Sequence, residues 1–292
     1  MAEKQIYKFT NDIDEVEVCS LGAPITVRST DDSGITAEYD NPNNKPEFCA
    51  VLCGKRLTLK EKAGFWLFNT RPKEDYSITV FLPKKLYAEL KINTASGGVD
   101  ITDESVTAEK FNLNTASGDV AVRAFFGELR IKTASGNVSI SNPTADMSKL
   151  LKINTASGKV SVDGYKAEKF SICSVSGHTE YIGAGGEGDI SVTSGYVDVS
   201  YDDWNGDLKI GAVSGNVKVS FPDNSGADVQ FDGVSGMVKT DLGNEQGKFM
   251  NLGKGTSGEF GGDNTHKVSV NLVSGTVTLA QKSAVETAKE TL

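Results

Sequence analysis

The sequence predicts an all-β fold, a single-stranded parallel β-helix or β-solenoid of about ten coils with an N-terminal β cap region. A Ser-Gly pair recurs ten times at spacings of 17 to 22 residues, which is short for a helix-pair repeat and typical of one β-solenoid turn. Around each pair, apolar residues recur at the strand period of two. The 292 residues also include 31 Gly and 7 Pro, a composition that favours short strands joined by tight corners.

Each copy of the repeat holds two short strands that meet at the Ser-Gly pair. With the Ser as position zero, most residues at positions −6 and −4 before it and at +3 and +5 after it are apolar; Gly188 at −6, Thr179 at +3 and Thr240 at +5 are exceptions. The inward positions are therefore even before the pair and odd after it, and this change of parity requires a corner or bulge. Gly fits there because it lacks a Cβ, and the Ser hydroxyl can satisfy a backbone group that the bend frees. The predicted corner glycines are Gly97, Gly118, Gly136, Gly158, Gly177, Gly195, Gly215, Gly236, Gly258 and Gly275.

Successive copies are expected to stack as the rungs of one column, because a two-strand coil has no hydrogen-bonding partner within itself. The ninth copy, centred on Ser257, departs from the pattern because Asn251, Gly253 and Gly262 replace apolar residues. We expect the weakest coil there. Its segment "GKGTSG" matches the glycine spacing of nucleotide-binding loops, but no helix pattern follows it, so no nucleotide site is predicted.

Residues 1–82 form a predicted N-terminal β region that starts or caps the solenoid. They lack the Ser-Gly spacing but alternate like strands in "EVEVCS", "ITVRS", "ITAEYD", "RLTLKEK" and "YSITVFLP". Pro83 marks the boundary to the repeat solenoid, residues 83–281. Residues 282–292 form a polar C-terminal tail that either folds as a short helix over the last coil or frays.

The segment "AGFWLFN" brings Phe65, Trp66 and Phe68 close together in the first region. A loop that exposes these rings could bind a sugar or a groove in a protein. The alternative, which we favour, is that the rings cover the hydrophobic end of the solenoid.

Charge and hydropathy exclude several classes of partner. The net charge is −9 and the pI is near 4.9, so we expect no nucleic acid partner. No run of about 18 apolar residues occurs, so we expect no direct membrane insertion. The first residues contain no apolar run of the length that a secretory leader needs. The chain as given is therefore predicted to be soluble and cytoplasmic, and a cell-surface location is the alternative if a leader is missing.

The four cysteines are too few and too unevenly placed for a disulfide scaffold. Cys49 and Cys53 would lie on one face of a strand without a matching His pair, so we predict buried free thiols rather than zinc ligands. The sequence predicts no metal site and no cofactor.

Polar side chains on successive coils of one outer face are brought together by stacking. The best such cluster places His178 beside Tyr196 and Glu180 beside Asp198, with Lys218 on the next coil. Neighbouring carboxylates can raise one pKa and supply an acid and a base. An ordinary solvated face is favoured over an active site, so no catalytic residue is predicted and the first four residues are candidates for binding only.

A column of small or β-branched residues stands at position −1, directly before each Ser. By strand parity these side chains point outward and form a flat apolar stripe that could dock a partner, a second copy or the N-terminal region. The alternative, which we favour, is that the corner has already begun and the stripe lines the interior. The column consists of Ala95, Ala116, Ala134, Ala156, Val175, Thr193, Val213, Val234, Thr256 and Val273.

The stretch "YSITVFLPKKLYAELKINTASGGVDI", followed by serial "TASG-x-V-x-V" copies, resembles the bacterial putative-adhesin domain of unknown function. The resemblance covers about residues 35 to 280. It implies a β-solenoid and an adhesin-like role, and it supplies no catalytic residues.

Two functional hypotheses remain at this point. The first is a non-enzymatic, adhesin-like β-solenoid that acts as a binding or scaffold module in envelope-related sensing or adhesion. Its partner would be an unknown protein or glycan, or a second copy docked through a solenoid face. The second is a carbohydrate-active enzyme of parallel β-helix type. Such enzymes need converging acids and a long cleft built by loops, whereas the loops here are only a few residues long.

Overall fold

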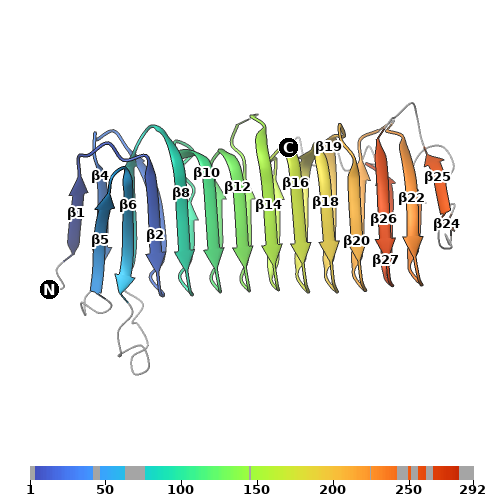
Figure 1. The fold of residues 1–292 in the computed structure, drawn as a ribbon, viewed down its shortest axis with the longest axis horizontal. Helices are drawn as coiled ribbons and strands as arrows, with labels where there is room; N and C mark the ends of the chain where they lie inside the picture. Colours follow the sequence, from blue (N-terminus) through green and yellow to red (C-terminus); the bar gives the residue numbers. More distant parts are fainter. Residues whose placement is uncertain are drawn as a thin grey trace, which may run out of the picture. The chain divides into compact units, whose positions relative to one another are not determined.

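The structure is a computed structural model that describes residues 4–41, 47–62, 76–144, 146–223, 225–241, 249–250, 256–260 and 266–282. All regular secondary structure in these ranges is β-strand, as Figure 1 shows. The same ranges contain no helix with the length and apolar character needed to cross a bilayer. The chain divides into two compact units, Met1–Asp146 and Met147–Leu292.

Unit 1 contains two sheets, and from β6 to β13 consecutive strands alternate between them. One sheet has the order β1-β4-β7-β3-β9-β11-β13, and the other has the order β12-β10-β8-β2-β6-β5. Each coil contributes one strand to each sheet. The strands are β1 (Gln5–Phe9), β2 (Glu15–Ser20), β3 (Ile25–Thr30), β4 (Ile35–Asp40), β5 (Glu47–Cys53), β6 (Arg56–Lys62), β7 (Ser77–Pro83), β8 (Leu86–Thr94), β9 (Val99–Ile101), β10 (Thr107–Thr115), β11 (Val120–Arg123), β12 (Phe126–Thr133) and β13 (Val138–Ser141).

Unit 2 is built in the same way. Its sheets have the orders β15-β17-β19-β21-β27-β23-β24 and β14-β16-β18-β20-β26-β22-β25. The strands are β14 (Ser148–Thr155), β15 (Lys159–Asp163), β16 (Ala167–Ser174), β17 (His178–Gly185), β18 (Glu187–Val192), β19 (Tyr196–Asp203), β20 (Leu208–Ala212), β21 (Asn216–Phe221), β22 (Ala227–Gly233), β23 (Met237–Asp241), β24 (Phe249–Met250), β25 (Thr256–Phe260), β26 (Lys267–Leu272) and β27 (Thr276–Gln281).

Neighbouring coils pair in parallel with equivalent repeat positions opposite each other. Phe111 of β10, for example, lies opposite Leu90 of β8 and Leu129 of β12. The predicted inward positions are buried on both sides of the corner: Leu113 at −4 is 0% exposed and Val120 at +3 is 2% exposed. The all-β solenoid predicted from the sequence, with its change of parity at the Ser-Gly pair, is confirmed.

The stacking order departs from the predicted sequence order at one end of each unit. In unit 2 the last coil, β26–β27, lies between the coils β20–β21 and β22–β23. In unit 1 the first coil, β2–β3, lies between β8–β9 and β6–β7. Because the edges of all coils carry the same hydrogen-bonding pattern, a coil from either end of the chain can insert between two others.

Antiparallel strands cover the last parallel edges. In unit 1, β4 pairs with β7, β1 with β4, and β5 with β6. In unit 2, β25 pairs with β22 and β24 with β23. Such covers keep the unpaired edge of a terminal coil from pairing with other chains.

Gly258 is a correction to the predicted corner glycines. It lies within β25, opposite Val229 in an antiparallel pair, so the ninth Ser-Gly copy makes an edge strand instead of a corner. The loss of apolar residues at Asn251, Gly253 and Gly262 gives the physical reason, because this segment cannot fill the inside of a coil.

Several of the remaining corners share one hydrogen-bonding arrangement. The Ser hydroxyl donates to the carbonyl of the −1 residue in the neighbouring coil, as Ser135 does to Ala116 (3.2 Å) in unit 1. The same bond is made by Ser117, Ser176, Ser194, Ser214 and Ser274. Ser274 donates in the same way to Val213 (3.0 Å), which agrees with the inserted position of the last coil. The corner glycines stack as well: a Cβ on Gly195 would lie 2.4 Å from the carbonyl oxygen of Gly177. Stacking therefore excludes a side chain at these corners even where φ is negative.

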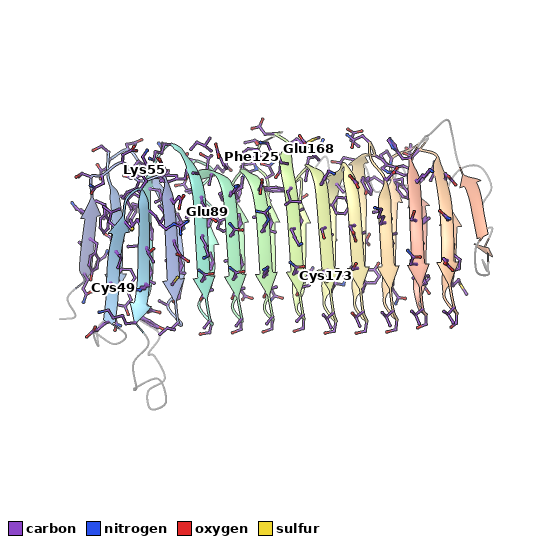
Figure 2. All side chains as sticks on the ribbon, viewed as in Figure 1. Cys49, Lys55, Glu89, Phe125, Glu168 and Cys173 are labelled. Atoms are coloured by element: carbon purple, nitrogen blue, oxygen red, sulfur yellow. The ribbon has the colours of Figure 1, made fainter. Side chains whose placement is uncertain are left out.

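The cysteines correct the prediction of buried thiols. All four are free, but Cys49 is half-buried and Cys53 is exposed, because β5 is the last strand of its sheet and its outward face meets solvent. Figure 2 labels Cys49 and Cys173. Cys173 is also exposed, at an outward position of β16.

Candidate functional site

The predicted polar cluster is assembled on the outward face of one sheet in unit 2. Parallel register places His178 opposite Tyr196 and Glu180 opposite Asp198. Lys218 follows opposite Asp198. On the other side, Lys159 lies opposite His178. We call these six residues the polar ladder.

Contacts between coils hold the polar ladder together. The rings of His178 and Tyr196 stack with centroids 4.9 Å apart, and the Tyr196 hydroxyl donates to Asp198 Oδ2 over 3.3 Å. Lys218 Nζ lies 3.7 Å from Asp198 Oδ2, and Lys159 Nζ lies 3.7 Å from Glu180 Oε2. Each stacked ring covers one face of the other, so that face is not available to a ligand.

Burial changes the acid–base properties of two members of the polar ladder. It raises the pKa of Asp198 above the usual carboxyl range, while Lys218 and the Tyr196 hydroxyl partly offset the shift. Burial, followed by the nearby Asp198 charge, raises the pKa of Tyr196. Neither Glu180 nor Asp198 lines the walls of the two hollows described for this chain. The polar ladder thus lies outside both hollows, and the side chains of Glu180 and Asp198 remain 37% and 26% exposed on the sheet face.

The column at position −1 points outward, contrary to the favoured interpretation that it lines the interior. Val175, Val213 and Val273 are 48%, 50% and 53% exposed, and Val234 is 85% exposed. Strand alternation continues through position −1, because the residues at −2, such as Ser174 at 1% exposed, still face the core. The corner turns only after this point.

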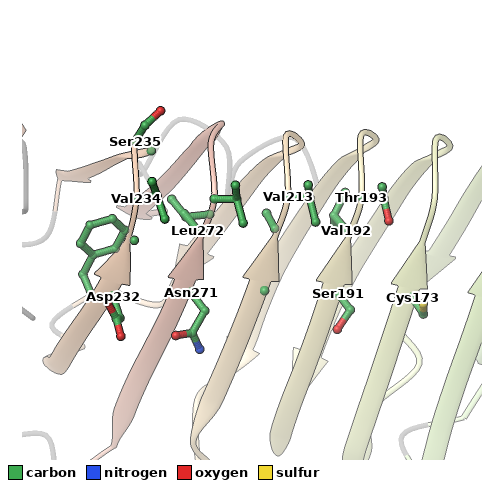
Figure 3. Close-up of a pocket in the computed structure, with 16 residues that line it drawn as sticks. Cys173, Ser191, Val192, Thr193, Val213, Asp232, Val234, Ser235, Asn271 and Leu272 are labelled. Atoms are coloured by element: carbon green, nitrogen blue, oxygen red, sulfur yellow. The ribbon is translucent and has the colours of Figure 1, made fainter. Parts of the chain in front are cut away.

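Three of these valines line a groove of about 880 Å³ in unit 2, which we call the corner groove. Thr193, Val213, Val273 and Val234 form one wall, and the −3 residues Ser191, Gly211, Asn271 and Asp232 lie beside them. Figure 3 shows the two rows on neighbouring coils. The groove deepens at Gly211, which has no side chain and no neighbouring atom within 4 Å of a Cβ placed there.

Phe65, Trp66 and Phe68 lie outside the described residues. The part of the chain that the structure describes holds no group of three or more His, Cys, Asp or Glu side chains placed to bind a metal ion.

Glu61 is a key residue that the sequence analysis missed. Its carboxylate is buried at the corner between β2 and β3, where it accepts hydrogen bonds from Ser20 Oγ (3.0 Å), Leu21 N (2.5 Å) and Tyr39 Oη (3.1 Å). A signal for it was present: in "RLTLKEK", Glu61 occupies the same inward parity as Leu57 and Leu59. A charged residue at an inward position indicates a buried partner.

Comparison with known proteins identifies relatives of this fold. A family model described as Toastrack DUF4097 matches residues 13–280. A solved structure of a putative adhesin from Parabacteroides distasonis is 14% identical with a TM-score of 0.56, and the match covers 95% of this chain and 97% of that one. A putative lipid binding protein from the same organism is 13% identical with a TM-score of 0.52, over 95% of this chain and 96% of that one. No curated protein matches the chain.

Proposed function

Since this chain belongs to the Toastrack DUF4097 family, we propose that it acts as a non-enzymatic binding module of the adhesin type. The partner is a protein that inserts apolar side chains into the corner groove of unit 2. The names of the two solved structures with this fold, adhesin and lipid binding protein, both describe binding rather than turnover, which supports the non-enzymatic part of the proposal.

The exposed valine row is the observation that carries this proposal. Val213, Val273 and Val234 lie on adjacent coils, and each leaves half or more of its surface in water. Burying such side chains against a partner contributes about 1.5–3 kcal/mol each when burial is complete. Contiguous apolar surface beside a groove is the usual mark of a binding site on a soluble protein.

A selection from a phage-displayed peptide library tests the groove directly. We expect the full chain to select peptides rich in apolar residues. The double substitution Val213→Thr and Val234→Thr should weaken the selected peptides at least tenfold, about 1.4 kcal/mol, because Thr keeps the shape and strand preference of Val but adds a hydroxyl that must stay hydrated. Val175→Thr is the matched control, since Val175 occupies the same column at similar exposure outside the groove.

Three results would contradict the proposal. Peptides that bind the double variant as well as the unchanged chain would show that the groove is not the site. Equal weakening by Val175→Thr would show a general effect of the valine column. Binding to phosphatidylcholine vesicles without any selected peptide would replace the protein partner by a lipid.

The enzyme hypothesis is tested at the polar ladder. We expect no turnover of acidic polysaccharides by the full chain, because Glu180 and Asp198 lie on an open sheet face and outside both hollows. Turnover that disappears in Glu180→Gln would overturn the non-enzymatic assignment. A glycan array screened alongside determines whether His178, Glu180, Tyr196 and Asp198 act as the binding residues predicted from the sequence.

A further inference from the structure

A second hollow, of about 310 Å³, lies on the outward face of unit 1. It forms because short side chains stand between long ones: Asn112 of β10 lies between Lys91 of β8 and Arg130 of β12 in the parallel register. Two residues further along β10, Asn114 lies between Asn93 of β8 and Lys132 of β12. Asn112 and Asn114 therefore form its floor. Figure 2 labels Glu89, which lies on its β8 rim.

Ion pairs and a hydrogen bond join several polar groups of this hollow. Arg56 Nε contacts Glu15 Oε2 at 2.5 Å, and Lys91 Nζ contacts Glu17 Oε1 at 2.8 Å. Asn112 Nδ2 donates to Glu89 Oε1 over 2.7 Å. Groups that are already oriented lose little entropy when a ligand binds, which favours recognition.

The floor amides have a definite polarity. Asn112 Nδ2 is turned to Glu89, and Asn114 Nδ2 is turned to Asn93 Oδ1 over 2.8 Å. Both acceptors belong to β8, so the two amide oxygens are turned toward β12, where Arg130 and Lys132 stand opposite. The hollow thus offers amide oxygens on its floor, N–H donors on its β12 rim and carboxylates on its other rim.

The charges in the walls nearly cancel. The lining holds the cations Arg56, Lys91, Arg130 and Lys132 and the carboxylates Glu15, Glu17 and Glu89. A strongly anionic or cationic ligand would meet repulsion as well as attraction. A neutral ligand with many hydroxyl groups meets neither cost, because each hydroxyl both donates and accepts a hydrogen bond. We propose that this hollow of unit 1 binds a neutral oligosaccharide, a ligand different in class from the apolar partner of unit 2.

Calorimetric titration of the full chain with three neutral hexasaccharides, cellohexaose, mannohexaose and chitohexaose, tests this site. We expect at least one to bind with a Kd of about 0.1 to 10 mM, the weak range suited to a small open hollow without an aromatic platform. Because the ligand is uncharged, the Kd should change less than about twofold when the salt concentration rises from about 0.15 to 0.5 M.

Substitutions locate the binding. Asn112→Leu removes the floor amide and fills the hollow, so it should weaken binding at least about tenfold. Lys132→Gln replaces the charged rim donor by a shorter, uncharged amide and should weaken binding about threefold; no partner of Lys132 is found among the described residues, so the fold should be unaffected. Asn154→Leu is the control, because Asn154 holds in unit 2 the −3 position that Asn114 holds in the floor of this hollow, and it lines neither hollow.

The proposal is overturned if none of the three hexasaccharides binds at about 20 mM, since a Kd beyond that range is not recognition. It is also overturned if only an acidic probe, polygalacturonate or heparin, binds. Equal weakening by Asn154→Leu, or unchanged binding in both Asn112→Leu and Lys132→Gln, would place the saccharide elsewhere. All of these results are independent of the valine substitutions in the corner groove, so this site and the proposed protein-binding site stand or fall separately.

Discussion

In unit 1 the row beside the corners consists of Ala95, Ala116 and Ala134, whereas the corresponding row of unit 2 contains Val175, Val213, Val273 and Val234. The corner itself is the same in both units. Ser117 donates to the carbonyl of Ala95 (3.4 Å), and Ser214 donates to the carbonyl of Thr193 (3.1 Å).

The corner uses only the backbone of the −1 residue, so the fold leaves its side chain free to vary. In unit 1 the side chains of this row are small, and the nearby hollow is lined by ion-paired polar residues. In unit 2 larger valine side chains in the same row line an apolar groove. The comparison separates what the fold requires, at the core and the corner, from what the two surfaces add.

The largest effect is expected from a charge in the core, and it should be equal in the two units. Val138→Asp in unit 1 and Val160→Asp in unit 2 place a carboxylate at position +3, where both valines are at most 2% exposed. Each should cost more than about 4 kcal/mol and abolish cooperative unfolding, because a buried unpaired charge is not compensated. Thermal unfolding followed by circular dichroism measures the loss.

Adjacent outward positions provide the controls for the core substitutions. Ser139→Asp and Ser161→Asp add the same charge one residue later, on the solvent side of β13 and β15. They should change stability by no more than about 0.5 kcal/mol. An unchanged melting curve for Val138→Asp would contradict the register of unit 1.

The corner glycines should give the next largest effect, again similar in both units. A Cβ on Gly118 would lie 2.6 Å from the carbonyl oxygen of Gly97, and φ is 120° there. A Cβ on Gly195 would lie 2.4 Å from the Gly177 carbonyl oxygen. Alanine at either position should destabilise the chain by about 2 kcal/mol, because the backbone of the neighbouring coil must move.

Gly211→Ala is the control for the corner glycines, since a Cβ at that position meets open space. It should be neutral or stabilise slightly by restricting the unfolded chain. If Gly195→Ala proved as mild as Gly211→Ala in urea denaturation, stacking would not be the reason for Gly at the corners.

Local patterns in the sequence predicted the core and the corners, because inward parity and the need for a bend are properties of each copy by itself. The inserted coil β26–β27 was not predictable in this way. The edges of β20 and β22 offer the same hydrogen bonds to any copy, so the sequence of one copy does not specify its neighbour. The degenerate residues around Ser257 did signal an exception, and the structure shows its form, an antiparallel edge strand.

The candidate surfaces were predicted in part, for a related reason. His178 and Tyr196 were paired correctly because consecutive copies stack there. The outward direction of the valine row was one of two alternatives, since a one-residue difference in where the corner begins reverses it. The hollow of unit 1 depends on differences in side-chain length between neighbouring strands, and these emerge only when Asn112 is set between Lys91 and Arg130.

Removing either of two buried hydroxyls near the corners should change stability by a smaller amount, with opposite signs in the two units. Thr179 of unit 2 is fully buried, and its hydroxyl finds no partner among the described residues. Thr115 of unit 1 is also buried, but its hydroxyl donates to the carbonyl of Ser117 over 2.8 Å. Thr179→Val should therefore stabilise the chain by about 1 kcal/mol, and Thr115→Val should destabilise it by about as much. Chemical denaturation measures both; the same sign for both variants would show that the hydroxyl of Thr179 is satisfied in solution.

The smallest effect concerns the pH dependence of stability at repeat position +4. This position is occupied by Asp100 in unit 1 and by Asp198 in unit 2. Asp100 of unit 1 accepts hydrogen bonds from Arg28, which lower the pKa of its carboxyl. Asp198 of unit 2 is desolvated, which raises its carboxyl pKa. A lowered pKa in the folded chain gives stability that is present above the ordinary carboxyl pKa and lost as pH falls through the folded value. A raised pKa has the reverse effect, so ionisation of Asp198 costs stability as pH rises through its folded value.

Replacing each aspartate by asparagine should therefore shift the melting temperature in opposite directions at pH 7. The melting temperature should fall in Asp100→Asn and rise slightly in Asp198→Asn. For Asp198→Asn, the free energy of unfolding should increase by no more than about 0.5 kcal/mol. Both differences should shrink as the pH is lowered toward about 3, because the carboxyls of the unfolded chain and of folded Asp198 become protonated, whereas folded Asp100, with its lowered pKa, follows only at lower pH. Melting curves of the two variants and the unchanged chain across this pH range measure the effect. A fall in the melting temperature of Asp198→Asn at pH 7 would mean that the ion pair with Lys218 outweighs desolvation. The ionised carboxylate at position +4 would then stabilise both units.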